Sequence, residues 1–217
     1  MSEFSPIARS PIVPAPPLDR LDGWEISRRQ SSAALRVLDL TPCAKLLLRG
    51  CPTPTLRDLL PSFGHAMRVK DGPLAVATVP DQWLLIGPPD AAPPIQRWIN
   101  SIELPQITLI AVTHARVLLR IAGESSARLL AKVCAINFAL AAFPDGRAVR
   151  TSLAGLPCEI VRDDFDGSLR RTAPEVASNA TLSYLILCER QVGQYLFETL
   201  LDAGSEYHIE VDGFSFN

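Results

Sequence analysis

The stretch Thr108–Asn137, TLIAVTHARVLLRIAGESSARLLAKVCAIN, contains two apolar runs, a glycine and an amphipathic segment in succession. The apolar and β-branched runs predict strands over Leu109–Thr113 and Arg116–Ile121. Gly123 ends the second run, and Glu124–Ser126 supplies the hydroxyls and negative charge that favour a helix start. The helix that follows has an apolar face, made by Ala127, Leu130, Ala131 and Cys134.

The turn at Gly123 resembles the strand–helix turns that bind phosphates, but it has a single glycine. It forms neither GxGxxG nor GxxxxGK[ST], the two patterns that wrap a phosphate group in backbone N–H groups. We therefore interpret Gly123 as a packing turn in a mixed fold and not as part of a nucleotide site.

Bulk composition excludes several classes of protein. The 217 residues are 47% hydrophobic, enough for one sizeable core or two small ones. A net charge of −2 gives no basis for binding nucleic acid or an anionic membrane, and no apolar run is long enough to span a bilayer. The N-terminus lacks a signal-peptide pattern, and none of the five cysteines forms a CxxC pair. We expect a cytoplasmic protein with reduced thiols.

The N-terminal residues 1–22 are rich in proline, which removes backbone donors and favours extended geometry. This segment cannot build a core on its own. It is interpreted either as a disordered tail or as an arm that wraps a partner. Residues 23–217 are expected to form one domain, entered through a polar loop over Trp24–Arg36 with a short strand near Ala34–Leu38.

A first unit is predicted before the opening stretch. It has a strand at Lys45–Arg49, a helix start at Thr53-Pro54, strands at Leu74–Val79 and Gln82–Ile86, and a helix at Pro94–Ser101. Threonine is a good N-cap, and proline suits the first helical position because its missing N–H is not needed there. The order of elements in this unit is β-α-β-β-α.

The second unit is expected to repeat this order. Leu48-Arg49 matches Leu119-Arg120 at an offset of 71, and Trp83–Ile86 matches Tyr184–Leu187 at an offset of 101. The difference of 30 residues predicts an insertion between about residues 139 and 180. A closing helix over 194–201 ends at Gly204, and a last strand covers 207–211. The fold class is α+β, with duplicated β-α-β-β-α units in halves of about 40–105 and 108–211.

The residues that could carry chemistry are scattered along the chain. His65, His114 and His208 have no cysteine or carboxylate at metal-ligand spacing, although His114 lies between two strands and could reach a cleft. Ser125 and Ser126 suit a helix cap better than a nucleophile, since no GxSxG pattern surrounds them.

The acidic and sulfur-containing residues are likewise given structural interpretations. The acidic cluster lacks an EF-hand pattern and is expected to be a solvated turn; its members are Asp163, Asp164 and Asp166. Cys134 and Cys188 are predicted core residues, whereas Cys51 has a basic neighbour that could lower its pKa. The sequon Asn179-Ala180-Thr181 has no meaning in a cytoplasmic protein. We predict no catalytic, cofactor-binding or metal-binding residue in this chain.

Five short patterns resemble the γ subunit of heterotetrameric sarcosine oxidase, over roughly residues 24–211. The patterns are Pro80–Gly87 (PDQWLLIG), Thr113–Arg116 running into Ile121–Gly123, Leu129–Cys134 (LLAKVC), Arg150–Ala154 (RTSLA), and Cys188–Gln191 through Tyr195-Leu196. The resemblance implies the folate-binding fold of the aminomethyltransferases. It also implies a heterotetramer that oxidises an N-methyl amino acid, as in sarcosine catabolism. In such a complex the γ subunit is a non-catalytic structural component packed against the α subunit.

The same resemblance implies the partners and cofactors. Alpha, beta and delta subunits are expected as partners, with FAD, FMN, NAD and tetrahydrofolate bound by those subunits and none by this chain alone. A second hypothesis is a free-standing folate-binding, aminomethyltransferase-like enzyme or assembly factor. The iron–sulfur assembly branch of that fold is disfavoured because Arg49–Pro52 shares only Gly-Cys with its motif and lacks the glutamine. A third hypothesis is an adaptor that binds through the proline-rich tail.

Overall fold

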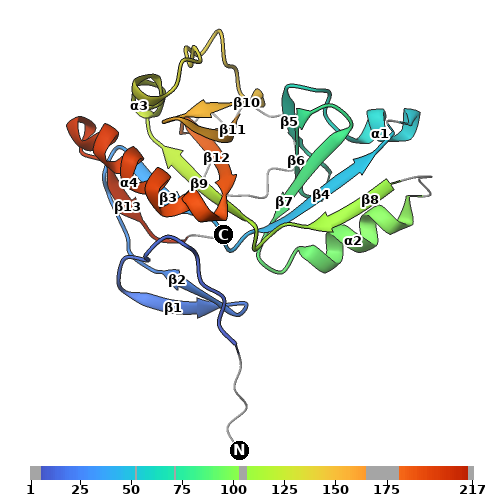
Figure 1. The fold of residues 1–217 in the computed structure, drawn as a ribbon, viewed down its shortest axis with the longest axis horizontal. Coiled ribbons are helices and arrows are strands. Elements are labelled where there is room, and N and C mark those ends of the chain that lie inside the picture. The colour runs from blue at the N-terminus through green and yellow to red at the C-terminus, as the bar shows by residue number, and fades with distance from the viewer. Residues whose placement is uncertain (1–5, 52, 71, 103–106, 165–180, 215–217) are drawn as a thin grey trace, which may run out of the picture.

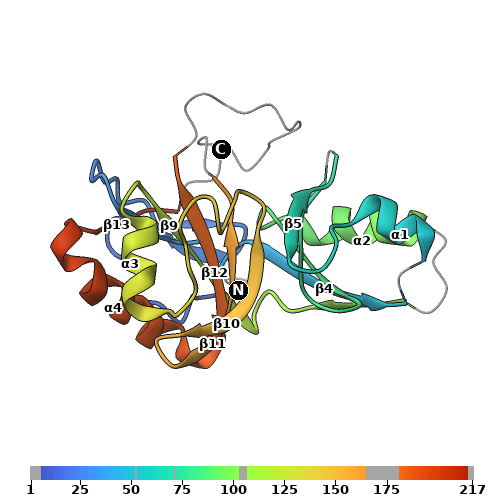
Figure 2. The same cartoon turned by 90° about the horizontal axis from the view of Figure 1, so that it is seen from above.

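The computed structural model describes residues 6–51, 53–70, 72–102, 107–164 and 181–214. Two β-sheets face each other, and each carries its helices on the side away from the other sheet (Figures 1 and 2). The α+β class expected from the sequence is confirmed. Three apolar clusters follow from this layering: one under each pair of helices and one between the sheets.

The first sheet has the strand order β5-β6-β7-β4-β8, with antiparallel neighbours throughout. Helices α1 and α2 cover its outer face, where the apolar residues of both helices and of the strands form one cluster. Thr53 is the N-cap of α1, and its side chain accepts a hydrogen bond from Leu56 N, as predicted. The elements are β4 Ala44–Gly50, α1 Pro54–Leu59, β5 His65–Arg68, β6 Leu74–Val79, β7 Gln82–Gly87, α2 Ala92–Ser101 and β8 Ile107–Ala111.

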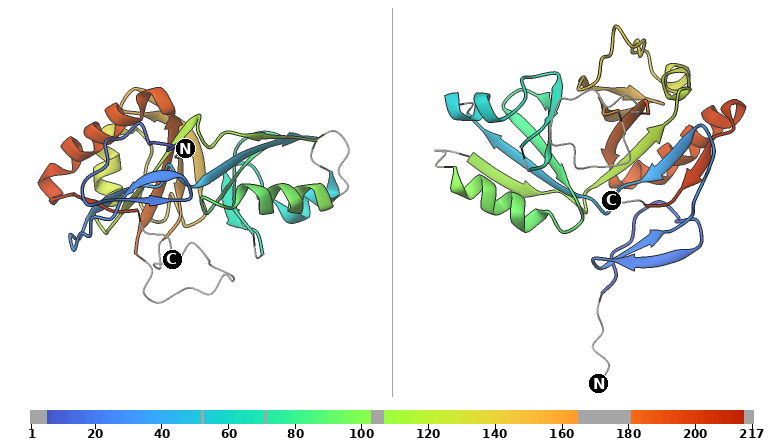
Figure 3. Two further views of the ribbon diagram at one scale, coloured as in Figure 1. Left: turned by 90° about the horizontal axis from the view of Figure 1, so that it is seen from below. Right: turned by 180° about the vertical axis from the view of Figure 1, so that it is seen from behind.

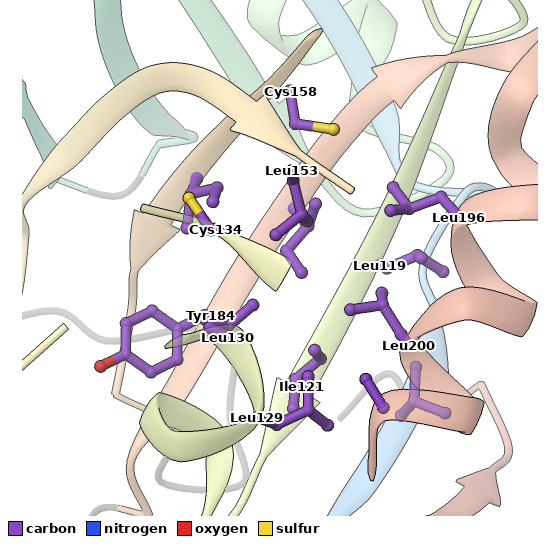
Figure 4. Packing of buried hydrophobic residues seen from close by; sticks show 14 of the residues in the cluster. Leu119, Ile121, Leu129, Leu130, Cys134, Leu153, Cys158, Tyr184, Leu196 and Leu200 are labelled. Atoms are coloured by element: carbon purple, nitrogen blue, oxygen red, sulfur yellow. The ribbon is translucent and has the colours of Figure 1, made fainter. Parts of the chain in front are cut away.

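The second sheet has the order β10-β11-β12-β9-β3-β13, with only β13 parallel to its neighbour β3. Helices α3 and α4 cover its outer face, and Figure 4 shows Leu129 and Leu130 of α3 packed with Leu196 and Leu200 of α4 over β9. The elements are β3 Arg36–Asp39, β9 Arg116–Ala122, α3 Ser126–Val133, β10 Ala148–Leu153, β11 Leu156–Arg162, β12 Ser183–Glu189, η1 Arg190–Val192, α4 Gly193–Gly204, η2 Ser205–Tyr207 and β13 Glu210–Asp212.

The two halves have the same order of elements, but each contains one strand more than predicted. The first half runs β4-α1-β5-β6-β7-α2 and the second runs β9-α3-β10-β11-β12-α4. The sequence prediction lacked β5, a four-residue strand without β-branched residues. It also assigned residues 139–180 to an insertion, whereas β10 and β11, which lie in this range, hold the places that β5 and β6 hold in the first sheet.

The two sheets exchange strands. β3 precedes β4 in the chain but pairs with β9, and β8 precedes β9 but pairs with β4. The two crossing segments are hydrogen-bonded to each other, because Lys45 N donates to Thr113 Oγ1 at 2.9 Å. This exchange joins the halves through the backbone as well as through side chains.

The N-terminal segment packs on the body of the same chain. β1 (Leu18–Leu21) and β2 (Trp24–Ser27) form a hairpin where the sequence suggested loop and tail (Figure 3). Ahead of it, Ile12 is 2% exposed and belongs to the core under α3 and α4. Val13 N donates to Gln194 Oε1 at 2.9 Å. The described part of this segment is therefore an arm, and the surface that it contacts is its own domain.

The helix after Gly123 differs in detail from the prediction. Ser125 makes no capping hydrogen bond; instead Ser126 Oγ donates to Gly123 O at 2.6 Å. Leu129 and Leu130 lie at the centre of the buried face, and Ala131 is exposed. Gly123 has φ +135°, and a Cβ there would lie 2.0 Å from Ala34 O, so this turn requires glycine for packing, as predicted.

Candidate functional site

Among the described residues, several charged side chains enter the layer between the two sheets. β9 alternates along its length: Val117, Leu119 and Ile121 contact the helices, whereas Leu118 faces the opposite sheet. Strand alternation places Arg116 and Arg120 on the same side as Leu118. The two arginines therefore enter an apolar layer, whose members include Leu74, Val76, Leu84, Ile86, Val161, Leu185 and Leu187.

A buried clamp of charged and polar groups lies at one end of this layer. Arg120 is 1% exposed, and its Nη2 lies 2.6 Å from Asp163 Oδ2. Arg68, from β5 of the other sheet, donates to both carboxylate oxygens of Asp163 at 3.1 Å. Ser183 Oγ accepts from Arg120 Nη1 at 2.7 Å. One carboxylate thus joins a guanidinium of each sheet.

The electrostatic balance of the buried clamp favours the charged form of Asp163. Burial alone raises the pKa of this carboxyl, but Arg120 and Arg68 outweigh that effect and hold the pKa below its ordinary value. A carboxylate held ionised in this way is suited to fixing two arginines. It is not suited to accepting a proton near neutral pH.

A rim clamp lies at the other end of the layer, four residues along the same two strands. Glu159 of β11 accepts a hydrogen bond from Arg116 and another from Thr78 Oγ1 of β6, the latter at 2.6 Å. Arg116 also lies 3.5 Å from the half-exposed carboxylate of Glu189. The rim clamp likewise joins the two sheets, and it is more accessible to solvent than the buried clamp.

The strand crossover contains a third polar group, the fully buried Lys45. Its Nζ donates to Thr41 O at 2.7 Å and to Cys43 O at 2.8 Å. Burial lowers the pKa of Lys45 to about 8 and raises that of the nearby Asp39. The lysine Nζ therefore stabilises the β3–β4 connection, since both acceptors are backbone carbonyls of that connection.

The enclosed cavities next to the buried clamp and Asp39 are small. A cavity of about 30 Å³ is lined by Arg68, Leu118 and Leu185, and another of about 20 Å³ lies under the arm beside Asp39 and Phe197. Each is of the size of a single water and far below the several hundred Å³ of a cofactor pocket. A larger depression of about 500 Å³ is open to solvent and lies between Pro11, Ala115 and the residues 189–194.

The three histidines are not brought together. His114 is exposed and stacks on Trp24 with ring centroids 4.8 Å apart, while His65 hydrogen-bonds locally to Ser62. His208 occupies a left-handed turn after α4 with φ +52°. Within the described ranges, no three histidine, cysteine or acidic side chains are placed to hold a metal ion.

The cysteines and acidic residues show one confirmed prediction and one error. Cys134 and Cys188 are buried as predicted, and burial raises the pKa of Cys188 to about 11.

Asp163 was expected in a solvated turn but is buried in the clamp, and Asp164 accepts from Arg162 Nη2 at 2.8 Å. Asp166 and Asn179-Ala180 lie outside the described residues, and Cys51 is exposed. The sequence signal that was missed is the alternation of side chains along a strand: two arginines of β9 and two acids of β11 and its end lie on the inward side of strands that are separated by β12.

Comparison with known proteins identifies the fold. No protein-family model matches the sequence, and no curated protein matches it significantly. Among solved structures, the chain is similar to a chain of the heterotetrameric sarcosine oxidase from Corynebacterium sp. U-96 in complex with pyrrole 2-carboxylate. That match has a TM-score of 0.63 at 20% identity and covers 83% of this chain and 89% of that one.

It is also similar to the glycine cleavage system aminomethyltransferase T from Bartonella henselae. Here the TM-score is 0.65 at 14% identity, over 90% of this chain. This chain spans 55% of the aminomethyltransferase. The two likenesses establish the aminomethyltransferase and sarcosine oxidase fold. None of the helices among the described residues is long and apolar enough to cross a membrane.

Proposed function

We propose that this chain is a γ-type, structural subunit of a heterotetrameric flavoenzyme that oxidatively demethylates an N-methyl amino acid. The observation that carries the proposal is the match in length to a chain of sarcosine oxidase. The aligned part is 83% of 217 residues, or about 180 residues, and this is 89% of a chain of about 200. Nearly the whole of this chain therefore corresponds to nearly the whole of one component of that assembly.

The pairing of the charged groups between the sheets supports a structural role for this chain. Arg120, Asp163 and Arg68 satisfy one another between the sheets, and Lys45 is bound to backbone carbonyls. Ionisable groups that are paired with one another in this way hold a fold together. On this proposal the FAD, FMN, NAD and tetrahydrofolate of the complex belong to alpha, beta and delta subunits.

The repeated order of elements supports an origin by internal duplication. Both halves have three further strands and two helices after the first strand, and in both sheets that first strand lies beside the last of these three. The exchange of β3 and β8 then explains why the halves form one domain: neither sheet is complete without a strand that precedes the other half.

The proposal is tested by purifying the chain, carrying an affinity tag, from its own cells. We expect it to elute with larger chains, flavin absorbance and oxidation of sarcosine or another N-methyl amino acid. The same chain produced alone should fold but show neither flavin absorbance nor oxidation. Elution without a flavoprotein, or amine oxidation by the chain alone, would overturn the proposal.

A second candidate is a free-standing folate-binding protein, favoured by the likeness to aminomethyltransferase T over 90% of this chain. Calorimetric titration of the isolated chain with tetrahydrofolate distinguishes the two. Saturable, stoichiometric binding favours the second candidate, and the structural-subunit proposal predicts none.

A further inference from the structure

The four edges of the two large sheets differ in how they are protected. β5 and β10 cover each other, because Ala66 N donates to Gly146 O at 2.7 Å and Ala148 N donates to Gly64 O at 2.9 Å. β13 is only three residues long and carries Glu210 and Asp212. β8, with the sequence Ile-Thr-Leu-Ile-Ala, has no charge, proline or bulge. Edge strands are normally blunted by such features, so β8 is the exposed exception.

The register shows which backbone groups of β8 point outward. Val112 N donates to Lys45 O, and hydrogen-bonded pairs alternate along an antiparallel ladder, so Ile110 and Thr108 bond to β4. The N–H and C=O groups of Ile107, Leu109 and Ala111 consequently face away from the sheet. No described residue pairs with this side of β8.

The side chains around β8 indicate which kind of segment could bind at this edge of the sheet. On the face away from α2, Ile110 is 40% exposed and lies opposite the half-buried Leu47. The next pair on this face is Thr108 with Arg49, both exposed. Arg49 forms no ion pair with any described residue. The surface therefore offers an apolar contact beside a positive charge that no described acid neutralises.

We infer that β8 receives an extended segment of a partner subunit, which adds to the sheet as a sixth strand with an apolar residue against Ile110 and a carboxylate near Arg49. Only an extended chain offers donors and acceptors at the spacing of Ile107, Leu109 and Ala111. A second copy of this chain would bring β8 itself, which has no carboxylate, together with a second Arg49. Charge complementarity therefore favours a different chain. The inference rests on the proposed function, which supplies that partner.

The test uses the tagged chain alone and in the flavin-containing complex purified from its own cells. Hydrogen exchange resolved to single residues should show the amides of Ile107, Leu109 and Ala111 protected at least about tenfold in the complex. The amides of Thr108 and Ile110, which are bonded to β4 in both states, provide the internal control. Unchanged exchange of the outward amides in an intact complex overturns the inference and leaves the proposed function standing.

Two pairs of variants test the same point. Ala111→Pro removes an outward N–H without removing a bond to β4, and Ala111→Val keeps that N–H. We expect the proline variant to lower recovery of the flavoprotein at least about tenfold and the valine variant to leave it unchanged. Arg49→Glu should weaken recovery and Arg49→Lys should not, with equal urea midpoints confirming that every variant folds.

The remaining outcomes are also decisive. Equal recovery with Ala111→Pro and Ala111→Val shows that no strand is added at β8. Protection of the outward amides in the chain alone, rising with its own concentration, identifies a second copy as the occupant and overturns the inference. If no flavin-containing complex forms, the proposed function and this inference fall together.

Discussion

The two clamps between the sheets use the same chemistry in different surroundings. Each consists of an arginine of β9 and an acid of β11 or its end, and each reaches a residue of the first sheet. Arg120 of the buried clamp is 1% exposed, whereas the Arg116 side chain of the rim clamp is 22% exposed. The side chains of the two acids are about equally exposed, 10% for Asp163 and 8% for Glu159. Because water can reach Arg116 but not Arg120 once its acid is neutralised, the same substitution is expected to cost more at the buried end.

The largest effect is expected from Asp163→Asn. This substitution keeps the shape of the side chain but removes the negative charge that the buried Arg120 and the partly buried Arg68 share. Breaking one partner of a buried pair costs about 3–5 kcal/mol, so we expect a loss of that order in the free energy of unfolding, measured with urea. The double variant Arg120→Met/Asp163→Asn should be more stable than Asp163→Asn alone. An equal or greater loss in the double variant would contradict the pairing.

A smaller effect should appear on acidification. The folded pKa of Asp163 lies below its unfolded value of about 3.9, so its contribution is fully present above that pH. It is lost as the pH falls through the folded pKa. The difference in unfolding free energy between wild type and Asp163→Asn should therefore be constant above about pH 5 and shrink below about pH 4. A difference that grows on acidification would show the opposite sign of coupling.

At the rim, Glu159→Gln should cost less. Thr78 Oγ1 can still donate to the amide oxygen of glutamine, and Arg116 can turn toward Glu189 and water. We expect a loss of about 1–3 kcal/mol, measured in the same urea experiment. If Glu159→Gln destabilises as much as Asp163→Asn, burial is not what separates the two clamps.

The clamps also show which features of the structure could be predicted from the sequence and which could not. Local signals predicted both strands and the helix of 108–137, the packing role of Gly123 and the cap at Thr53, since each depends on neighbours in the chain. The sequence prediction placed Arg120 in a strand, but its partner Asp163 is 43 residues away. Asp163 also opens an acidic, glycine-containing string typical of loops. Only the strand order β11-β12-β9, a tertiary property, brings these residues together.

The same dependence on tertiary contacts explains why the sequence did not predict β5 or the packing of the N-terminal arm. The four residues of β5 carry little β-propensity, and they are held as a strand by β6 on one side and β10 on the other. Composition predicted that residues 1–22 build no core alone. It carried no information that Ile12 fills a place in a core formed mostly by residues more than a hundred positions later.

The smallest effect is expected at the outermost contact of the rim clamp. The side chain of Glu189 is 55% exposed and lies 3.5 Å from Arg116, which keeps Glu159 as its closer partner. Exposed pairs of this kind contribute little because water screens them, so Glu189→Gln should change the free energy of unfolding by less than about 0.5 kcal/mol. Its effect should also vanish at high salt, whereas that of Asp163→Asn persists. A loss at Glu189 as large as at Glu159 would mean that the rim is closed to solvent, and that the two clamps differ in partners and not in burial.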